Sequence, residues 1–518
     1  MTQAKSETTS ETAPRGISQS AALKIVAVLF VYVLAASILV AHMKGVWLDE
    51  IWSLWMSQHD VSFSQALHQR WLQDTNPPYF YMFAWLFEPL TRLDLFASRL
   101  LNLIPLALAV AGFLWLGVTR PKLRAFLIVY AGLIICSAFF VEDFSQLRSY
   151  FSQLCMASLL ASALFAVETE QRDFDRGDVG LAALILVTAT AVMSFHQVSA
   201  LITGAVLGFM GIAHVLAHRV RWGVVFLVIA FVAGLPLVFA EIGEIPYLRT
   251  ILPAFWVTTT TWEALHIVAS QTIKALLLNA AAAGAAVYVL TGLRQAPVRP
   301  LSPPLRFTIV MAVALSAACV AVVALNAVKP LIVPRYLILL TPYWRAALAA
   351  LGAEVILSRR WVFALFIANA AIVTAYTTQD EAFTGNWEDG ASVVSDAVDA
   401  CPKTIVYAVD PFIMTRPGVA PPPADNTETV HEWGYAYVAS NYGFQVQVIH
   451  PAALSALPLS PTCPTLLWSE HDYNNRLGLK DIAQRAKLPS DPGSLARMQL
   501  TRTDSGYVLS LAPFTPAR

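Results

Sequence analysis

The sequence predicts a polytopic α-helical membrane protein with about eleven transmembrane helices, followed by a small C-terminal α/β domain. Of its 518 residues, 57% are apolar and only 13% are charged, whereas soluble domains carry about 25% charged residues. Apolar runs of roughly 17 residues or more, the length that spans a bilayer, recur along the chain up to residue 377. Beyond that position, polar stretches and short β-like runs replace them.

Eleven runs are treated as spans. They lie at 21–41, 97–118, 123–141, 150–167, 179–195, 199–217, 222–240, 269–292, 306–326, 336–357 and 361–377. Residues 1–20 are polar and rich in Ser and Thr, which predicts a disordered cytoplasmic tail. The first apolar run is too long for a signal peptide and is expected to span. The run at 79–90 is too short to span, so it is expected to lie in the interface plane of the first outer loop.

Basic residues set the expected orientation, because cytoplasmic loops collect Lys and Arg. With the N-terminus inside and 79–90 not spanning, five basic loops fall on the inner side. They hold Arg120/Lys122/Arg124, Arg172/Arg176, His218/Arg219/Arg221, Arg294/Arg299/Arg306 and Arg359/Arg360. If 79–90 spanned, these loops would lie outside. The transmembrane domain is therefore assigned to 21–377, with a long outer loop at 241–268, and residues 378–518 are expected outside the cytoplasm.

The C-terminal segment has the pattern of a small α/β domain. Short β-like runs lie at 404–410, 444–449 and 465–469, and a helix is expected to open at Asn386-Trp387. Cys401 and Cys463 are its only two cysteines, and an extracytoplasmic compartment permits a disulfide between them. The alternative is two unpaired thiols, because the sequence does not show whether the Cα atoms come within about 4.4–6.8 Å.

Two adjacent carboxylates follow the first span, at the expected outer surface. Asp49 and Glu50 lie among Trp47, Trp52 and Trp55, and Trp is enriched where bilayer meets water. Because carboxylates against a membrane are costly, they are candidates for a functional site. Asp49 suits a general base, and Glu50 would share the site, raising one pKa by like-charge repulsion. The alternative is that Asp49 only caps a surface helix.

Further polar residues fall on the same outer face. Arg148 suits an anionic phosphate, because a guanidinium matches phosphate geometry, although a snorkelling arginine has the same position. His196 taken alone is a polar helix cap, and Arg335 a helix-end anchor. Their convergence with Asp49, under a topology chosen from charge alone, favours a site for a lipid-phosphate substrate and a hydroxyl acceptor.

Several short motifs lie in order along this face. They are Leu48-Asp49-Glu50, Asn76-Pro77-Pro78-Tyr79, Ala97-Ser98-Arg99-Leu100, Gln146-Leu147-Arg148-Ser149-Tyr150, Ser194-Phe195-His196, Pro334-Arg335-Tyr336-Leu337 and Asn386-Trp387. In order and spacing, over nearly the whole chain after residue 21, they resemble the GT-C-type glycosyltransferases, which include the protein O-mannosyltransferases and aminoarabinose transferases. Two positions depart from that pattern. Asn76 replaces a histidine, and Gln146 stands where a glutamate is common, so Glu142 or Asp143 is the expected substitute acid.

The resemblance implies a GT-C-like fold with interfacial helices in the first outer loop, in the bacterial inner (plasma) membrane. It implies transfer of a sugar from a polyprenyl-phosphate donor to a hydroxyl acceptor on the extracytoplasmic face, by an inverting single displacement. Asp49 would be the general base, with Glu50 beside it, and Arg148 would contact the donor phosphate. The other expected donor-binding residues are Glu142, Asp143, Tyr150, His196, Arg335, Tyr336, Asn76 and Tyr79.

Other function classes are weighed by charge and motif. The formal net charge of zero argues against a nucleic-acid partner, which needs a basic surplus. No zinc-type Cys/His cluster or phosphate-binding Gly-rich loop is present in the sequence. A divalent cation stays open, with Asp49, Glu50 and Glu142 as oxygen ligands. The competing class is a transporter or flippase of a lipid-linked sugar, which favours polar groups at the bilayer midplane. The sugar and the acceptor (lipid, glycan or protein) are left open.

Overall fold

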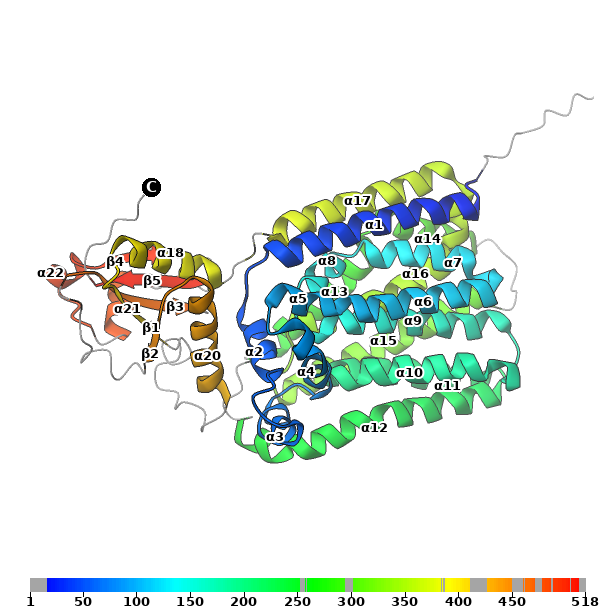
Figure 1. Ribbon diagram of the computed structural model, residues 1–518. Helices are drawn as coiled ribbons and strands as arrows, with labels where there is room; N and C mark the ends of the chain where they lie inside the picture. Colours follow the sequence, from blue (N-terminus) through cyan, green and yellow to red (C-terminus); the bar gives the residue numbers. More distant parts are fainter. Residues whose placement is uncertain are drawn as a thin grey trace, which may run out of the picture.

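A bundle of long helices carries a small sheet domain at one end, whereas the N-terminus of the first long helix lies at the other end (Figure 1). The computed structural model describes residues 16–251, 257, 259–293, 301–382, 384, 387–409, 426–449, 460, 462–470, 478–485, 488–503 and 505–511. Asn386 and most of the tail 1–20 lie outside these residues. The expected fold class is confirmed: a multi-pass helical membrane protein with a small C-terminal sheet region.

Nine helical segments in the described part of the chain are long and apolar enough to cross a membrane, and two bent pairs raise the number to eleven. The long helices are α1 (Gln19–Met43), α6 (Leu103–Thr119), α9 (Ser149–Glu170), α10 (Val179–Phe195), α11 (Gln197–Leu216), α12 (Val220–Ile251), α15 (Pro303–Val328), α16 (Leu340–Ser358) and α17 (Arg360–Ala382). The expected eleven spans are therefore reached when each bent pair crosses once.

The bent pairs replace two of the expected spans. Helices α7 (Arg124–Ile135) and α8 (Ala138–Phe144) meet at 59°, and α13 (Thr261–Leu277) and α14 (Ala280–Leu293) meet at 85°. The expected loop at 241–268 is wrong, because α12 continues to Ile251 and α13 already begins at Thr261. A capping box, in which Thr260 and Glu263 exchange hydrogen bonds, starts α13 there. The apolar run ends before the helix does, so it did not reveal the extension.

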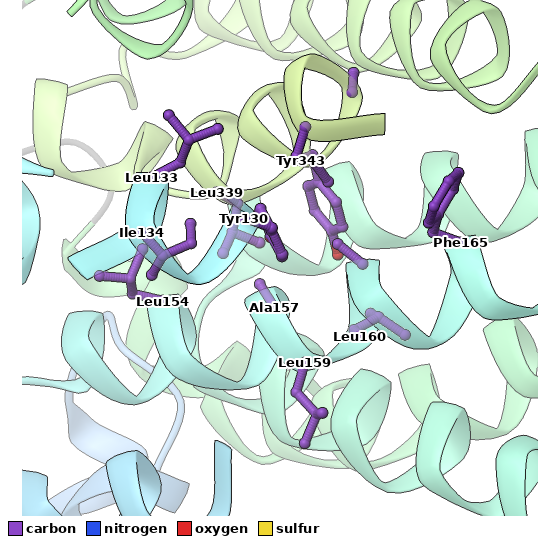
Figure 2. Close-up of a cluster of buried hydrophobic side chains, with 14 of the residues drawn as sticks. Tyr130, Leu133, Ile134, Leu154, Ala157, Leu159, Leu160, Phe165, Leu339 and Tyr343 are labelled. Atoms are coloured by element: carbon purple, nitrogen blue, oxygen red, sulfur yellow. The ribbon is translucent and has the colours of Figure 1, made fainter. Parts of the chain in front are cut away.

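Helix α9 lies at the centre of the bundle, with all of its spanning window buried. Figure 2 shows Leu154 and Ala157 of this helix in one buried cluster with Tyr130 of α7 and Tyr343 of α16. Three hydroxyls in this core bind one another or the backbone. The Tyr130 hydroxyl donates to the Pro342 carbonyl over 2.9 Å, and the hydroxyls of Tyr343 and Thr203 lie 3.0 Å apart. These three buried hydroxyls are therefore satisfied within the core.

Basic loops gather at the end of the bundle opposite the sheet domain (Figure 1). Buried Glu168 of α9 binds both Arg219, over 3.2 Å, and Arg306. Nearby, Arg120 pairs with Glu170 at 3.1 Å. Three of the basic loops expected on one side thus meet in linked ion pairs, so the loops share one face as their charge predicted.

The segment between α1 and α6, which is the first outer loop of the expected topology, consists of short helices that do not span. They are α2 (Leu48–Met56), α3 (Phe63–Gln69), η1 (Trp71–Gln73) and α4 (Tyr79–Thr91). Helix α4, predicted over 79–90, has only 13 residues, which is too short for a bilayer. The chain then enters the membrane through α5 (Leu95–Arg99) and η2 (Leu100–Asn102), which precede α6.

The C-terminal domain is a five-stranded mixed sheet with helices packed on it. The strands β1 (Ile405–Val409), β2 (Gln447–Ile449), β3 (Thr465–Glu470), β4 (Gln499–Arg502) and β5 (Gly506–Ser510) lie in the order β2-β1-β3-β5-β4. Strand β1 pairs in parallel with β2 and β3, and β5 pairs antiparallel with β3 and β4. The first three strands match the predicted runs. Cys401 and Cys463 form the predicted disulfide, with Cα atoms 5.8 Å apart.

The C-terminal domain shares one hydrophobic core with the first outer loop. Ile51 and Trp55 of α2 are buried in the same cluster as Trp387 of α18 (Trp387–Ala400) and Tyr435 of α20 (Asn426–Asn441). Packing is so close that a Cβ on Gly434 would lie 2.6 Å from the Ile51 Cγ2 atom. Helix α2 is thus held between the membrane domain and the C-terminal domain.

Candidate active site

Helix α2 is fixed to the membrane domain by a buried ion pair. Glu50 is wholly buried, and Arg99 donates to its two carboxylate oxygens over 2.8 and 2.6 Å. Arg99 also donates to the carbonyls of Ala41 and Gly45, both over 2.9 Å, and Glu50 accepts from the backbone N–H of Leu147 at 2.8 Å. This bidentate, fully hydrogen-bonded arrangement ties α2 to α1, α5 and the start of α9.

Asp49, the neighbouring residue, faces two other arginines. Its Oδ2 atom lies 2.8 Å from Nη1 of Arg335 and 3.4 Å from Nη2 of Arg148. Arg148 also donates to the Asp49 carbonyl over 3.1 Å and to the Ser53 hydroxyl over 3.2 Å. Burial alone would lower the pKa of the Arg148 guanidinium, but Asp49 and nearby tyrosines raise it well above its usual value. The site therefore holds two permanent cations around one carboxylate.

Aromatic side chains surround this charged group. The Arg335 guanidinium lies over the rings of Trp47, at 5.4 Å, and Tyr336, at 5.8 Å. Buried Tyr150 interacts electrostatically with Arg335, Arg148 and Asp49. Cation–π contacts of this kind hold a guanidinium in place without using its hydrogen-bond donors.

His196 stands beside the same group. Its ring lies 4.2 Å from that of Tyr336, and its Nδ1 atom accepts from the backbone N–H of Val198 at 3.1 Å, capping α11. Burial, aided by the cations Arg335 and Arg148, lowers the pKa of His196 to about 3. The ring is therefore neutral at physiological pH, and His196 acts as a helix cap rather than as a proton donor.

A second polar group lies on the loop after η1. Buried Asp74 accepts from the hydroxyl of Tyr81 at 2.5 Å and from the side-chain amide of Asn76 at 3.3 Å. Burial raises the pKa of the Asp74 carboxyl, and Arg148 opposes this rise. Asp74 therefore lies within electrostatic range of Asp49, Arg148 and Arg335, which we call the Asp49 group. Tyr79 points elsewhere, because its hydroxyl donates to the Pro236 carbonyl of α12 over 2.5 Å.

The structure thus brings some of the expected site residues together and places others elsewhere. Asp49, Arg148, Tyr150, His196, Arg335 and Tyr336 come together. Glu50 does not share the site with Asp49, because consecutive helix residues point about 100° apart and Glu50 faces Arg99. Glu142 and Asp143 are also not beside Arg148: they interact electrostatically with each other, and Glu142 does so with Lys44 and Glu381. The bend after α7 turns α8 toward α1 and α17.

The three residues considered as ligands of a divalent cation lie in different groups. Asp49 faces two guanidinium groups, Glu50 is bonded to Arg99, and Glu142 belongs to the cluster around Lys44. Among the described residues, no three His, Cys, Asp or Glu side chains are grouped so that they could hold a metal ion.

Four residues of the site, Arg99, Ser53, Asp74 and Tyr81, have no role predicted from the sequence. Arg99 lies in one of the outer-face motifs, and an arginine inside an apolar run next to Ser98 is a signal of a buried partner. Asp74 lies two residues before the Asn-Pro-Pro-Tyr motif, so it is visible as a charge near the membrane. Nothing in the sequence points to Ser53 or to the pairing of Tyr81 with Asp74.

Comparison with known proteins shows the fold. Neither a protein-family model nor a curated protein matches the sequence. Solved structures do match. The apo structure of ArnT from Cupriavidus metallidurans has a TM-score of 0.53 at 16% identity, covering 94% of this chain and 99% of that one. The structure of the same enzyme bound to undecaprenyl phosphate has a TM-score of 0.51 at 15% identity, with the same coverage. The chain therefore has an ArnT-like, GT-C-type fold over nearly its whole length.

Proposed function

We propose that this protein is a membrane glycosyltransferase that moves a sugar from a polyprenyl-phosphate donor to a hydroxyl acceptor on the extracytoplasmic side. The observation that carries the proposal is the Asp49 carboxylate flanked by Arg335 and Arg148. The group lies at the end of the bundle opposite the basic loops, next to the C-terminal domain. The ArnT-like fold supports the donor class, because ArnT itself has been solved with undecaprenyl phosphate bound.

In this proposal the two arginines bind the donor phosphate. A guanidinium matches the oxygens of a phosphate as well as those of a carboxylate. The phosphate therefore competes with Asp49 for Arg335 and Arg148, and its arrival frees the carboxylate for the acceptor. The cations also favour the ionised carboxylate, the form that accepts a proton.

The transfer itself is an inverting displacement. Asp49 takes the proton of the acceptor hydroxyl as the oxygen forms its bond to the anomeric carbon. The bond from that carbon to the phosphate oxygen breaks, and polyprenyl phosphate leaves with the electron pair. Arg148 and Arg335 stabilise the negative charge that develops on the phosphate. This electrostatic stabilisation is largest in a site that excludes water.

The transporter alternative has less support. A transport route needs polar groups available at the bilayer midplane, whereas the buried hydroxyls of Tyr130, Tyr343 and Thr203 bind one another or the backbone. The ion pairs of the basic loops and the Asp49 group lie at the two ends of the bundle.

The test is mass spectrometry of envelope glycans from cells with and without the gene. We expect one sugar to be missing from a lipid, glycan or protein in the deletion strain, and to return with the wild-type gene but not with Asp49→Asn. Restoration by Asp49→Asn at equal protein level would remove Asp49 as the general base, and an unchanged set of envelope glycans in the deletion strain would refute the enzyme proposal.

A further inference from the structure

A cavity lies between the membrane domain and the C-terminal domain, next to α2 and separate from the Asp49 group. We call it the inter-domain cavity; the end of α1, the turn at 92–96 and one face of α20 line it. Its volume is about 820 Å³, within the range of roughly 300–1,000 Å³ that small-molecule sites occupy. The polar residues of its lining come from both domains, so the cavity exists only while the two are docked.

The α20 wall of the cavity is an aromatic platform. Trp433, Ala436, Tyr437 and Ser440 line it, and this spacing places them on one helix face. The rings of Trp433 and Tyr437 are stacked, with centroids 5.0 Å apart and planes at 19°. A stacked ring pair offers a flat apolar surface whose edges are polar. That surface complements the C–H face of a pyranose ring.

The charged groups of the lining are nearly balanced. Lys44 and Arg99 line the cavity, but each is paired, with Glu381 and Glu50 respectively. The other charged residues of the lining are one cation, Arg92, and two anions, Asp94 and Glu388. A polyanion would require a cationic surplus here. The Asn441 amide, the Ser440 hydroxyl oxygen and the charged groups instead offer both donors and acceptors, which suits a neutral polyhydroxylated ligand.

The turn that forms the opposite wall has a costly backbone. Arg92 and Leu93 are consecutive residues with φ of 52° and 58°, in the left-handed region that residues with side chains rarely adopt. The Tyr437 hydroxyl donates to the Leu93 carbonyl at 3.1 Å, so the C-terminal domain helps to hold the turn. Strained turns retained in this way cluster at ligand sites, and this one presents Arg92 and Asp94 to the cavity.

We propose that the inter-domain cavity binds a saccharide, and that this saccharide is the non-reacting part of the acceptor. The cavity borders the ion pair that holds α2, because Arg99 lines it and binds Glu50, the residue after Asp49 in the chain. Identifying the saccharide as acceptor rests on the proposed function; the binding of a saccharide does not. Interactions with a remote part of a substrate serve to position its reacting group.

Photo-crosslinking in cells tests the proposal, because it captures whichever cellular molecule occupies the cavity. p-Benzoylphenylalanine is placed in the full-length protein at Ser440, in the cavity lining, or at Glu432, an exposed residue of α20 outside the lining. After irradiation, the protein is purified and its adducts are analysed by mass spectrometry and for monosaccharides released by acid hydrolysis. We expect a saccharide-containing adduct at 440 and none at 432.

Platform variants connect the adduct to the aromatic wall. Trp433→Ala should lower the adduct yield at 440 by about tenfold through the loss of a stacking face, and Trp433→Phe should keep most of it. Equal yields in Trp433→Ala, an adduct that holds only membrane phospholipid, or no adduct above the control at 432 would each overturn the proposal.

The Asp49→Asn background separates this proposal from the proposed function. Asp49 does not line the cavity, so the adduct should form at 440 in that background while sugar transfer is lost. Adduct formation in the protein that keeps Asp49, without any sugar transfer by that protein, would leave the saccharide site standing and refute the enzyme. Transfer without any saccharide adduct would do the reverse.

Discussion

The Asp49 carboxylate and the Arg335 guanidinium meet at 2.8 Å, although one lies on α2 in the first outer loop and the other on η6 (Pro334–Leu337), before α16. This contact joins the first and the late parts of the membrane domain at one point. Arg148 approaches the same carboxylate from the start of α9 at 3.4 Å. An ion pair with two guanidinium groups on one carboxylate is well suited to exchange that carboxylate for a phosphate.

Replacing Arg148 tests the exchange. Arg148→Ala should weaken undecaprenyl phosphate binding by about 2–5 kcal/mol, as truncation of a desolvated charge partner does. Arg148→Lys should recover only part of the lost affinity, because an ammonium lacks the planar pair of N–H donors with which a guanidinium binds a phosphate. Affinity is measured with the purified protein in nanodiscs, and Lys122→Ala, on the opposite face, is the matched control. Unchanged affinity in Arg148→Ala would make this residue a membrane anchor.

Replacing Glu50 separates structure from chemistry. Glu50→Gln leaves the Arg99 cation buried without its counter-charge, which typically costs about 3–5 kcal/mol. We therefore expect a lower thermal unfolding temperature for Glu50→Gln, whereas Asp49→Asn, whose side chain is partly exposed, should unfold close to wild type. If both variants melt like wild type, the Glu50–Arg99 pair does not hold α2.

The orientation is testable by cysteine labelling. A membrane-impermeant maleimide added to intact cells should modify cysteines introduced at Ser64 and Ser440, which are exposed on the outer side of the proposed topology. It should not modify cysteines at Lys122 or Arg360 until the membrane is opened. A Cys319→Ser background removes the one partly exposed native thiol among the described residues. Labelling at 122 from outside would invert the topology.

The C-terminal domain should lose stability as pH rises. Burial raises the pKa of the Glu470 carboxyl to about 8, against an ordinary value of about 4.3 in an unfolded chain. The folded state thus favours the protonated acid, so its stability is full below about pH 4 and falls as pH rises toward 8. The protection factors of the β3 and β5 amides, which correct hydrogen exchange for its intrinsic rise with pH, should fall over this range in the full-length protein. Glu470→Gln should make the stability of the domain less dependent on pH. An unaltered pH dependence in this variant would assign the effect to another titrating group.

Much of the fold was predictable, because span length, basic loops and interfacial aromatic residues are strong signals in a membrane protein. The non-spanning helix α4, the first three strands and the Cys401–Cys463 disulfide followed from run length, β-pattern and compartment. The bends between α7 and α8 and between α13 and α14 did not, because an apolar run reports burial and not the direction of the helix axis. The extension of α12 was missed because the helix continues to Ile251, beyond the end of its apolar run.

The site was predictable as a set of outer-face residues and less so as a geometry. Charge and topology brought Asp49, Arg148 and Arg335 to one face. They could not show that Glu50 faces away from Asp49 toward Arg99, since that depends on the rotation of α2. Glu142 and Asp143 were placed beside Arg148 by sequence proximity, whereas α8 carries them toward Lys44. Long-range pairs such as Asp74 with Tyr81 require the packed loop.

The most direct test of the central claim is sugar transfer by purified Asp49→Asn protein in nanodiscs. The donor is the undecaprenyl-phosphate sugar, and the acceptor is the species identified by envelope-glycan mass spectrometry. The exchange is nearly isosteric and removes the base, so turnover should fall by about 10²–10⁴-fold while undecaprenyl phosphate still binds. Wild-type turnover in Asp49→Asn would contradict the assignment of Asp49 as the general base.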